Sequence, residues 1–212
     1  MLDVLRDLRL ALDFQRRIGG ALLPVLTTAP AAPSEPEPTA PDAMATFDLF
    51  GNAADPADDP ALSPYERIEA LIPPTSPLRK MASLDEIFEW LSKTVLIPLD
   101  EQRIKPVLGT GDPNADLMII GEAPGADEDR QGEPFVGRAG MLLNKILEAV
   151  NFMREEVYIT NILKSRPPGN RDPLPEEVEG HLPILYKQIA LVKPKVILCV
   201  GKTAGNNLLG RS

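Results

Sequence analysis

Three short apolar runs that alternate with helical segments constrain the fold of this chain most. The runs are 116–121, 157–161 and 195–201, and the segments after them are 138–150, 175–191 and 202–209. Short apolar runs bounded by glycine are typical of buried strands, and apolar spacings of three and four are typical of helices. Strands that alternate with helices predict a parallel twisted sheet with helices on both faces, a three-layer α-β-α fold of the α/β class.

The carboxyl ends of the predicted strands are the places to look for a ligand site. In open sheets of this kind, ligands bind beyond those ends. Here the ends fall at 121–125, 161–166 and 201–203. A ligand site formed by this chain is therefore expected at these three segments.

The first 80 residues differ from the rest and hold 12 of the 23 prolines. Residues 1–26 carry leucines at helical spacing, which predicts an N-terminal amphipathic helix. Residues 27–80 are rich in Pro, Ala and acid, and we expect a disordered linker. A domain spanning 81–212 would follow. Inside it, Ser83 and Glu86 have capping-box spacing and predict a helix over about 84–93.

Charge and cysteine content exclude several classes of protein. The net charge of −9 argues against a generally basic nucleic-acid coat, although 105–212 is nearly neutral with 14 acids against 13 bases. The single cysteine, Cys199, excludes a disulfide framework and a cysteine-rich metal site within one chain. No apolar run approaches the roughly 20 residues of a membrane span, and the first residues lack the pattern of a secretory signal. We expect a soluble intracellular protein.

The turn after the first strand reads Gly121-Glu122-Ala123-Pro124-Gly125. Its glycines and proline form a tight turn that lets a ligand approach the backbone, with the Glu122 carboxylate beside it. Phe135 follows on a loop bounded by proline and glycine, where its ring could face a nucleobase or pack in the core.

The second strand ends at Asn161, whose amide could match the edge of a pyrimidine or cap a turn. Three bases follow it on a loop with two prolines, namely Lys164, Arg166 and Arg171. Basic side chains on a rigid loop suit phosphates, and a solvated loop is the plainer alternative.

In this order and spacing the pieces resemble the family 4 (type-4) uracil-DNA glycosylases, within the uracil-DNA glycosylase superfamily. The matching text is GEAPGADEDRQGEPFVGRAGMLL, then YITNILKSRPPGNRDPLPEEV, then PKVILCVGKTA. The resemblance covers 105–209, about half of the chain, and leaves the first 80 residues outside it.

The resemblance implies an enzyme that excises uracil from DNA by hydrolysing the bond between base and deoxyribose, the first step of base excision repair. It implies that Gly121, Glu122 and Ala123 border the base pocket. Phe135 would stack on the flipped uracil, and Asn161 would read its O4 and N3 edge. Glu122, with Glu128, would place the attacking water, and Lys164, Arg166 and Arg171 would contact the DNA backbone.

Two features depart from the family pattern. The family binds a four-iron, four-sulfur cluster through four cysteines, and the resemblance places these at Thr94, Ile97, Ser165 and His181. Because three of these side chains ligate such a cluster poorly and the lone His181 has no partner ligands, we expect no cofactor and no metal. The family also has a His-Pro-Ser motif after a further strand, which this sequence lacks. The resemblance therefore implies a C-terminally incomplete domain with an unpaired sheet edge.

Three hypotheses follow for function. The first is a uracil-DNA glycosylase without its cluster, acting on uracil-containing DNA in the bacterial cytoplasm at the nucleoid. The second is a non-catalytic DNA-binding module or degenerate remnant of the same fold, and the third is an unrelated nucleotide-binding α/β domain. Residues 46–50, from Thr46 to Phe50, also resemble a sliding-clamp docking peptide without its leading Gln, or are a chance apolar cluster.

Overall fold

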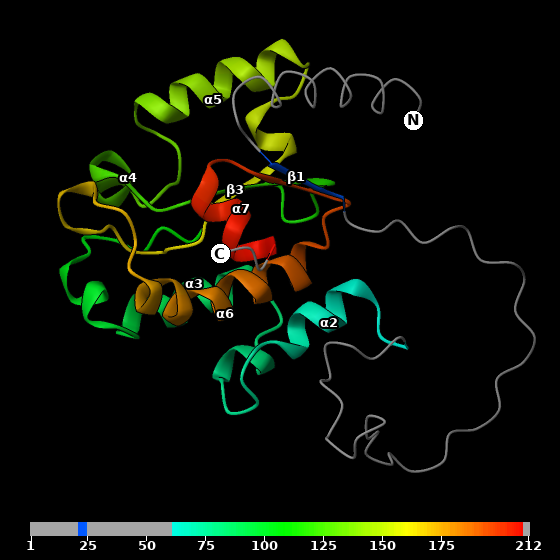
Figure 1. Ribbon diagram of the computed structural model, residues 1–212, viewed down its shortest axis with the longest axis vertical. Coiled ribbons are helices and arrows are strands. Elements are labelled where there is room, and N and C mark those ends of the chain that lie inside the picture. Colours follow the sequence, from blue (N-terminus) through cyan, green and yellow to red (C-terminus); the bar gives the residue numbers. More distant parts are fainter. Residues whose placement is uncertain (1–20, 25–60, 210–212) are drawn as a thin grey trace, which may run out of the picture.

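The strands form one mixed sheet in the computed structural model, which describes residues 21–24 and 61–209 (Figure 1). The strand order is β1-β5-β3-β4-β2. The bounds are Ala21–Pro24 for β1, Thr110–Gly111 for β2, Leu117–Gly121 for β3, Tyr158–Asn161 for β4 and Val196–Cys199 for β5. Strands β4, β3 and β5 are parallel, whereas β1 and β2 pair antiparallel with β5 and β4. The three predicted strands are thus parallel, and the sheet is mixed because two further strands, which lie outside the alternating strand–helix pattern, pair antiparallel at its edges.

Helices cover both faces of the sheet, which confirms the predicted three layers (Figure 1). Helix α5 spans Arg138–Ala149 and helix α6 spans Pro175–Val192. All five residues of β3 are buried, and successive side chains point to opposite faces. Leu117 and Ile119 pack in the cluster that contains the α5 leucines, and Met118 and Ile120 pack in the cluster that contains the apolar side chains of α6. Burial on both faces explains why this strand reads as a continuous apolar run.

Helix α6 crosses the molecule beneath the sheet and is the longest helix described, with 18 residues. It begins with Pro175 at its first turn, where the missing backbone N–H has no intrahelical partner to lose. The Glu177 carboxylate accepts a hydrogen bond from the Leu174 backbone N–H at 2.8 Å. Across residues 61–209, no helix combines the length and apolarity needed to cross a bilayer.

Helix α3 (Leu84–Lys93) confirms the helix predicted after Ser83. The Ser83 hydroxyl accepts from the Glu86 backbone N–H at 3.2 Å, which satisfies one of the free donors of the first turn. The Glu86 carboxylate reaches one residue further back than expected and accepts from the Ala82 backbone N–H at 2.7 Å.

Residues 61–80 are structured and belong to the domain, so the predicted linker is wrong over its last twenty residues. They form α2 (Pro64–Ala70) and the 3-10 helix η2 (Pro77–Lys80), and each begins with a proline in its first turn. Ile72 and Leu78 are buried in one cluster with Ile184 of α6. Two of the four prolines in this stretch, Pro64 and Pro77, start helices rather than break them, which the composition alone did not reveal.

Strand β1 occupies the free edge of β5, where an unpaired edge was expected. Four residue pairs join the two strands, from Ala21 opposite Cys199 to Pro24 opposite Val196. Residues 21–24 therefore form a strand, although the sequence placed them in the helical segment 1–26. The predicted helix over residues 2–18, most of the linker and the peptide at 46–50 lie outside the described residues, and the incomplete C-terminus stays a prediction.

Candidate active site

A pocket of about 480 Å³ lies at the carboxyl ends of the parallel strands. This is the edge at which the sequence predicted a ligand site. The loops after β3, β4 and β5 and the start of α5 all contribute. The lining residues are 121–128, 135, 137–139, 161, 167, 170–171 and 200.

Gly121 forms the part of the pocket where an aromatic ring and an amide meet. It ends β3 and lies opposite Asn161 in the parallel register. A Cβ atom on Gly121 would overlap Oδ1 of Asn161 and would lie 2.6 Å from Cζ of Phe135. Since real Cβ atoms do not approach so closely, only glycine fits here. The structure thus brings together three residues that the sequence placed 14 to 40 positions apart.

Phe135 is held in an unusual backbone conformation at the rim of this site. Its φ of 53° lies in the left-handed region, which residues other than glycine rarely adopt. The first turn of α5 approaches its carbonyl so closely that a Cβ on Gly140 would overlap it. On the other side, the Arg154 guanidinium donates to the Pro134 carbonyl at 2.5 Å. These contacts hold the backbone of Phe135, whose side chain lines the pocket and also packs against the core cluster between the sheet and α5.

Glu128 lies on α4 (Ala126–Gln131) and has a different use from the one predicted. One carboxylate oxygen accepts from the backbone N–H groups of Val136 at 3.1 Å and Gly137 at 2.8 Å. The other accepts from Gly125 N–H at 3.1 Å. With both oxygens engaged, this buried carboxylate ties the turn after β3 to the loop of Phe135. Its carboxylate thus serves to hold backbone at the edge of the pocket, and its predicted role in placing the water stays a prediction.

Asn161 presents an amide without a partner to the pocket. The residue is 2% exposed. Its backbone belongs to the sheet, but within residues 21–24 and 61–209 no group hydrogen-bonds to its side-chain amide. Buried polar atoms are almost always hydrogen-bonded, so an orphaned amide that lines a pocket indicates a ligand. The alternative of a turn-capping asparagine has no hydrogen bond to support it.

Glu122 is the free carboxylate of the site. It is half-buried, lines the pocket and forms no side-chain hydrogen bond or ion pair with any residue in the described ranges. Its neighbour Ala123 also lines the pocket and packs against the core. Of the two glutamates singled out from the sequence, Glu122 is therefore the one available to a ligand.

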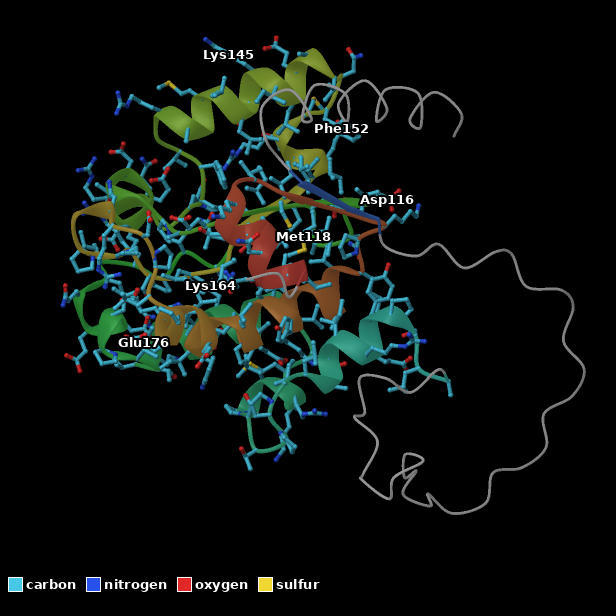
Figure 2. The ribbon with its side chains drawn as sticks, viewed as in Figure 1. Asp116, Met118, Lys145, Phe152, Lys164 and Glu176 are labelled. Atoms are coloured by element: carbon cyan, nitrogen blue, oxygen red, sulfur yellow. The ribbon has the colours of Figure 1, made fainter. Side chains whose placement is uncertain are left out.

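Lys164 does not lie on the surface, so its predicted contact with the DNA backbone is wrong. Its side chain is fully buried, and Figure 2 shows it in the interior, in contrast to Lys145 at the periphery. The ammonium donates to the Thr160 hydroxyl at 2.9 Å and to the Asn161 carbonyl at 2.5 Å. Burial holds the pKa of Lys164 well below its ordinary value. The side chain turns back under the end of β4, a direction that loop composition could not reveal.

Arg166 and Arg171 do lie on the loop beyond β4. Arg166 is half-exposed and donates to the Asn170 amide oxygen at 2.7 Å. Arg171 is exposed at the pocket and pairs with both carboxylate oxygens of Glu177, at 2.8 and 2.6 Å. These hydrogen bonds raise the pKa of Arg171 and lower that of Glu177. The pairing fixes one guanidinium at the pocket rim in a defined orientation.

Comparison with known proteins agrees with this geometry. The sequence profile of the Uracil DNA glycosylase superfamily matches residues 108–211. The type-4 uracil-DNA glycosylase of Archaeoglobus fulgidus is 47% identical over 124 residues, which are 58% of this chain and 62% of that protein. That of Pyrobaculum aerophilum is 43% identical over 126 residues, 59% of this chain and 64% of that protein. Over residues 108–211, about half of its length, the chain is similar to the uracil DNA glycosylase superfamily.

The chain spans about three fifths of the length of these relatives. A type-5 uracil-DNA glycosylase of Pyrobaculum aerophilum is more distant, at 32% identity over 120 residues. The similarity is thus strongest to the type-4 enzymes and weaker to the type-5 enzyme.

The four positions at which the resemblance placed cluster ligands do not fit an iron–sulfur cluster. Thr94, Ile97, Ser165 and His181 supply no thiolate. In the described ranges, no three His, Cys, Asp or Glu side chains converge as metal ligands. Asp100 lies among these positions instead. Burial raises its pKa, but hydrogen bonds from His181 and Ser165 outweigh burial and hold the pKa well below its ordinary value.

Sequence reasoning missed several residues of this site. Pro167, Asn170 and Arg138 line the pocket, Arg154 donates to the carbonyl before Phe135, and Asp100 accepts from Ser165 on the loop after β4. Asn170 stands in the quoted PPGNRDP text, so the rigid loop was a usable signal. For Arg154 and Asp100 the sequence offered no signal, because their partners are backbone atoms and distant residues.

Proposed function

We propose that the chain is a uracil-DNA glycosylase, which hydrolyses the bond between uracil and deoxyribose in DNA as the first step of base excision repair. The observation that carries the proposal is the orphaned amide of Asn161 beside the Phe135 ring at Gly121. An enzyme that acts on a base must take it out of the stack and recognise it by stacking and by its pairing edge. The named activity of the similar proteins supports the same conclusion.

The roles within the pocket follow from its geometry. The ring of Phe135 would stack on the flipped base. The NH₂ group of Asn161 would donate to uracil O4, and its amide oxygen would accept from N3–H. These two hydrogen bonds would give the unpaired amide both a donor and an acceptor partner. Gly121 leaves room for this arrangement because it has no side chain.

Glu122 is the group we assign to the chemistry. When the bond between C1′ and N1 breaks, uracil leaves with the electron pair and the sugar becomes oxocarbenium-like. A free carboxylate at the pocket stabilises that positive charge and orients a water. The water oxygen bonds to C1′, and its proton passes through Glu122 to the departed uracil. Ala123 carries no ionisable group, and Glu128 is engaged with backbone.

The partner is uracil-containing DNA in the cytoplasm, and its phosphates would meet Arg166 and Arg171 at the pocket rim. No cofactor takes part in this proposal. The sliding-clamp peptide at 46–50 lies outside the described residues and stays a prediction.

A second function, binding of uracil-containing DNA without cleavage, is favoured by one observation. The chain has a single histidine, His181. Its side chain is fully buried against Asp100 and is not among the pocket-lining residues, so it cannot support negative charge on the leaving uracil. Without that donor, recognition could persist while cleavage is lost.

Glu122→Gln separates the two functions. We expect this variant to bind a uracil-containing oligonucleotide as the unmodified protein does, because the amide keeps the size of the side chain. Its rate of uracil release should fall by about 10²–10³-fold, since the carboxylate charge is gone. Binding is measured by fluorescence anisotropy and release by alkaline cleavage of the abasic site. Tight binding with no release by the unmodified protein would establish the second function instead.

A further inference from the structure

A buried polar network that the proposed chemistry does not use lies behind the pocket. Its centre is Asp100 in the 3-10 helix η3 (Pro98–Gln102), whose side chain has no exposed surface. One carboxylate oxygen lies 3.1 Å from Nε2 of His181 and 3.0 Å from the Arg103 guanidinium, and it also accepts from the Ser165 hydroxyl. We call Asp100, Arg103, Ser165 and His181 the Asp100 network.

The network joins three segments that are far apart in the sequence. The other oxygen of Asp100 accepts from the backbone N–H groups of Leu96 at 2.9 Å and Ile97 at 3.3 Å. Arg103 donates to the Thr94 carbonyl at 2.7 Å and to the Leu91 carbonyl. Ser165 links the loop after β4 to Asp100, and His181 links α6 to Asp100. Each group in this dry interior has a partner, which is the condition under which a buried network specifies one structure.

These are the same segments that a cluster would join. Each of the four ligand positions contributes an atom to the network, through the Thr94 carbonyl, the Ile97 N–H, the Ser165 hydroxyl and the His181 imidazole. The space between them is filled by protein groups, and no thiolate faces it. These residues therefore cannot ligate a cluster. Their hydrogen bonds instead join the segments that a cluster would join.

The network also reaches Asn161. Nδ1 of His181 lies 3.3 Å from the Lys164 backbone N, so this nitrogen accepts the hydrogen bond. The ammonium of Lys164 in turn donates to the Asn161 carbonyl at 2.5 Å. His181 is thus connected through one residue to the strand end that carries the pocket amide.

We propose that the Asp100 network is a metal-free cross-link that takes the structural place of an iron–sulfur cluster and positions the end of β4 with Asn161. The cross-link itself does not depend on the proposed function. Only the consequence for uracil recognition rests on the proposed function. Asp100, Arg103, Ser165 and His181 act here as positioning residues and touch no reacting atom.

The first test is a double-mutant cycle on Asp100 and His181 in the full chain, read as melting temperature. Asp100→Asn should lower the melting temperature by roughly 10 °C, because it leaves buried partners uncompensated. The loss in the double variant with His181→Gln should be clearly smaller than the sum of the two single losses. Asp116→Asn is the matched control, since that exposed carboxylate pairs with Lys195 at 2.7 Å, and it should change the melting temperature by only about 1–2 °C.

Ser165→Ala gives a milder variant if Asp100→Asn does not fold, and it should lose a few degrees. An Asp100→Asn protein as stable as Asp116→Asn, or strictly additive losses, would overturn the cross-link.

The second test is for iron. The full chain, purified from cells grown with added iron and without exposure to air, should contain far less than one iron per chain. Its melting temperature should be the same with and without a chelator. Stoichiometric iron whose removal lowers the melting temperature would overturn the metal-free assignment.

The third test reads the position of Asn161 directly. Its side-chain NH₂ resonances can be assigned by their loss in Asn161→Ala. Ser165→Ala should shift them and Asp116→Asn should not. Resonances that stay in place in a destabilised Ser165→Ala protein would overturn the positioning role. Shifted resonances in a protein that never releases uracil would keep the cross-link and reject the proposed function.

Discussion

Gly121 sets how closely the ring and the amide of the pocket can approach each other. It has no Cβ, and both neighbouring side chains use the space that a Cβ would need. Replacing one hydrogen of Gly121 by a methyl group is therefore enough to test whether the ligand binds where the ring and the amide meet.

Gly121→Ala should lower uracil release by at least about 10²-fold, because the methyl group displaces Asn161 and Phe135 from their shared position. Overpacking should also cost about 1–3 kcal/mol of stability. Gly109→Ala is the control, since its Cβ would lie 2.7 Å from Cζ of Tyr158, away from the pocket-lining residues and from the Asp100 network. Both rates are normalised to folded protein. Equal loss of release in the two variants would mean that Gly121 acts only through packing.

At the scale of elements, Glu128 of α4 joins two loops that carry the pocket. Its two oxygens accept three backbone hydrogen bonds, from the turn after β3 and from the loop of Phe135. The backbone that carries the aromatic ring is thus held by hydrogen bonds to a side chain of α4.

Glu128→Gln should destabilise the protein by about 2 kcal/mol, because the amide nitrogen faces at least one backbone donor that the carboxylate satisfied. Uracil release by the folded fraction should fall as the Phe135 loop loosens. Glu133→Gln, on an exposed neighbour, should stay within about 0.5 kcal/mol. Chemical denaturation measures stability, and a Glu128→Gln protein indistinguishable from Glu133→Gln would contradict the tie.

The elements with regular patterns could be predicted from the sequence. Helix α3 follows its capping serine, and β3 follows its apolar run. The two antiparallel edge strands could not, because β2 has only two residues and β1 lies outside the alternating region. Likewise, α2 and η2 were hidden by a proline content that also marks linkers.

For the site, the sequence could bring Glu122, Phe135 and Asn161 together through their strand-end positions and the family resemblance. It could not predict side-chain direction. Lys164 and Arg166 stand two residues apart on one loop, yet one is buried under β4 and the other is half-exposed. Hydrogen bonds to backbone, as at Glu128, likewise leave no pattern in the sequence.

Across the whole molecule, the core is buried on both sides of the sheet, and this makes stability sensitive to alkaline pH. Burial raises the pKa of the Cys199 thiol from its ordinary value near 9 to about 11. Burial likewise raises the pKa of Tyr158, against a hydrogen bond from Gln188, to about 12. Both groups stay protonated to a higher pH in the folded state than in the unfolded state. Their contribution to the free energy of unfolding is therefore complete below the unfolded pKa and is lost as pH rises through the folded pKa.

Between pH 9 and 10, Cys199 is the first of these two groups whose ionisation in the unfolded state lowers the free energy of unfolding. The free energy of unfolding should fall there by up to about 1.4 kcal/mol per pH unit. Cys199→Ala should show a shallower decline over the same interval, because it has no thiol to ionise when unfolded. Urea denaturation in the presence of reductant at each pH measures both slopes. Identical slopes would contradict a buried neutral thiol.

The central claim is that the Asn161 amide recognises uracil for excision. The most direct measurement is uracil release from single-stranded oligonucleotides that differ only in one base, with the full chain and Asn161→Ala compared side by side. We expect release of uracil but not of thymine or cytosine, and a loss of about 10²-fold or more in Asn161→Ala. No release by the folded chain, or equal release by Asn161→Ala, would contradict it.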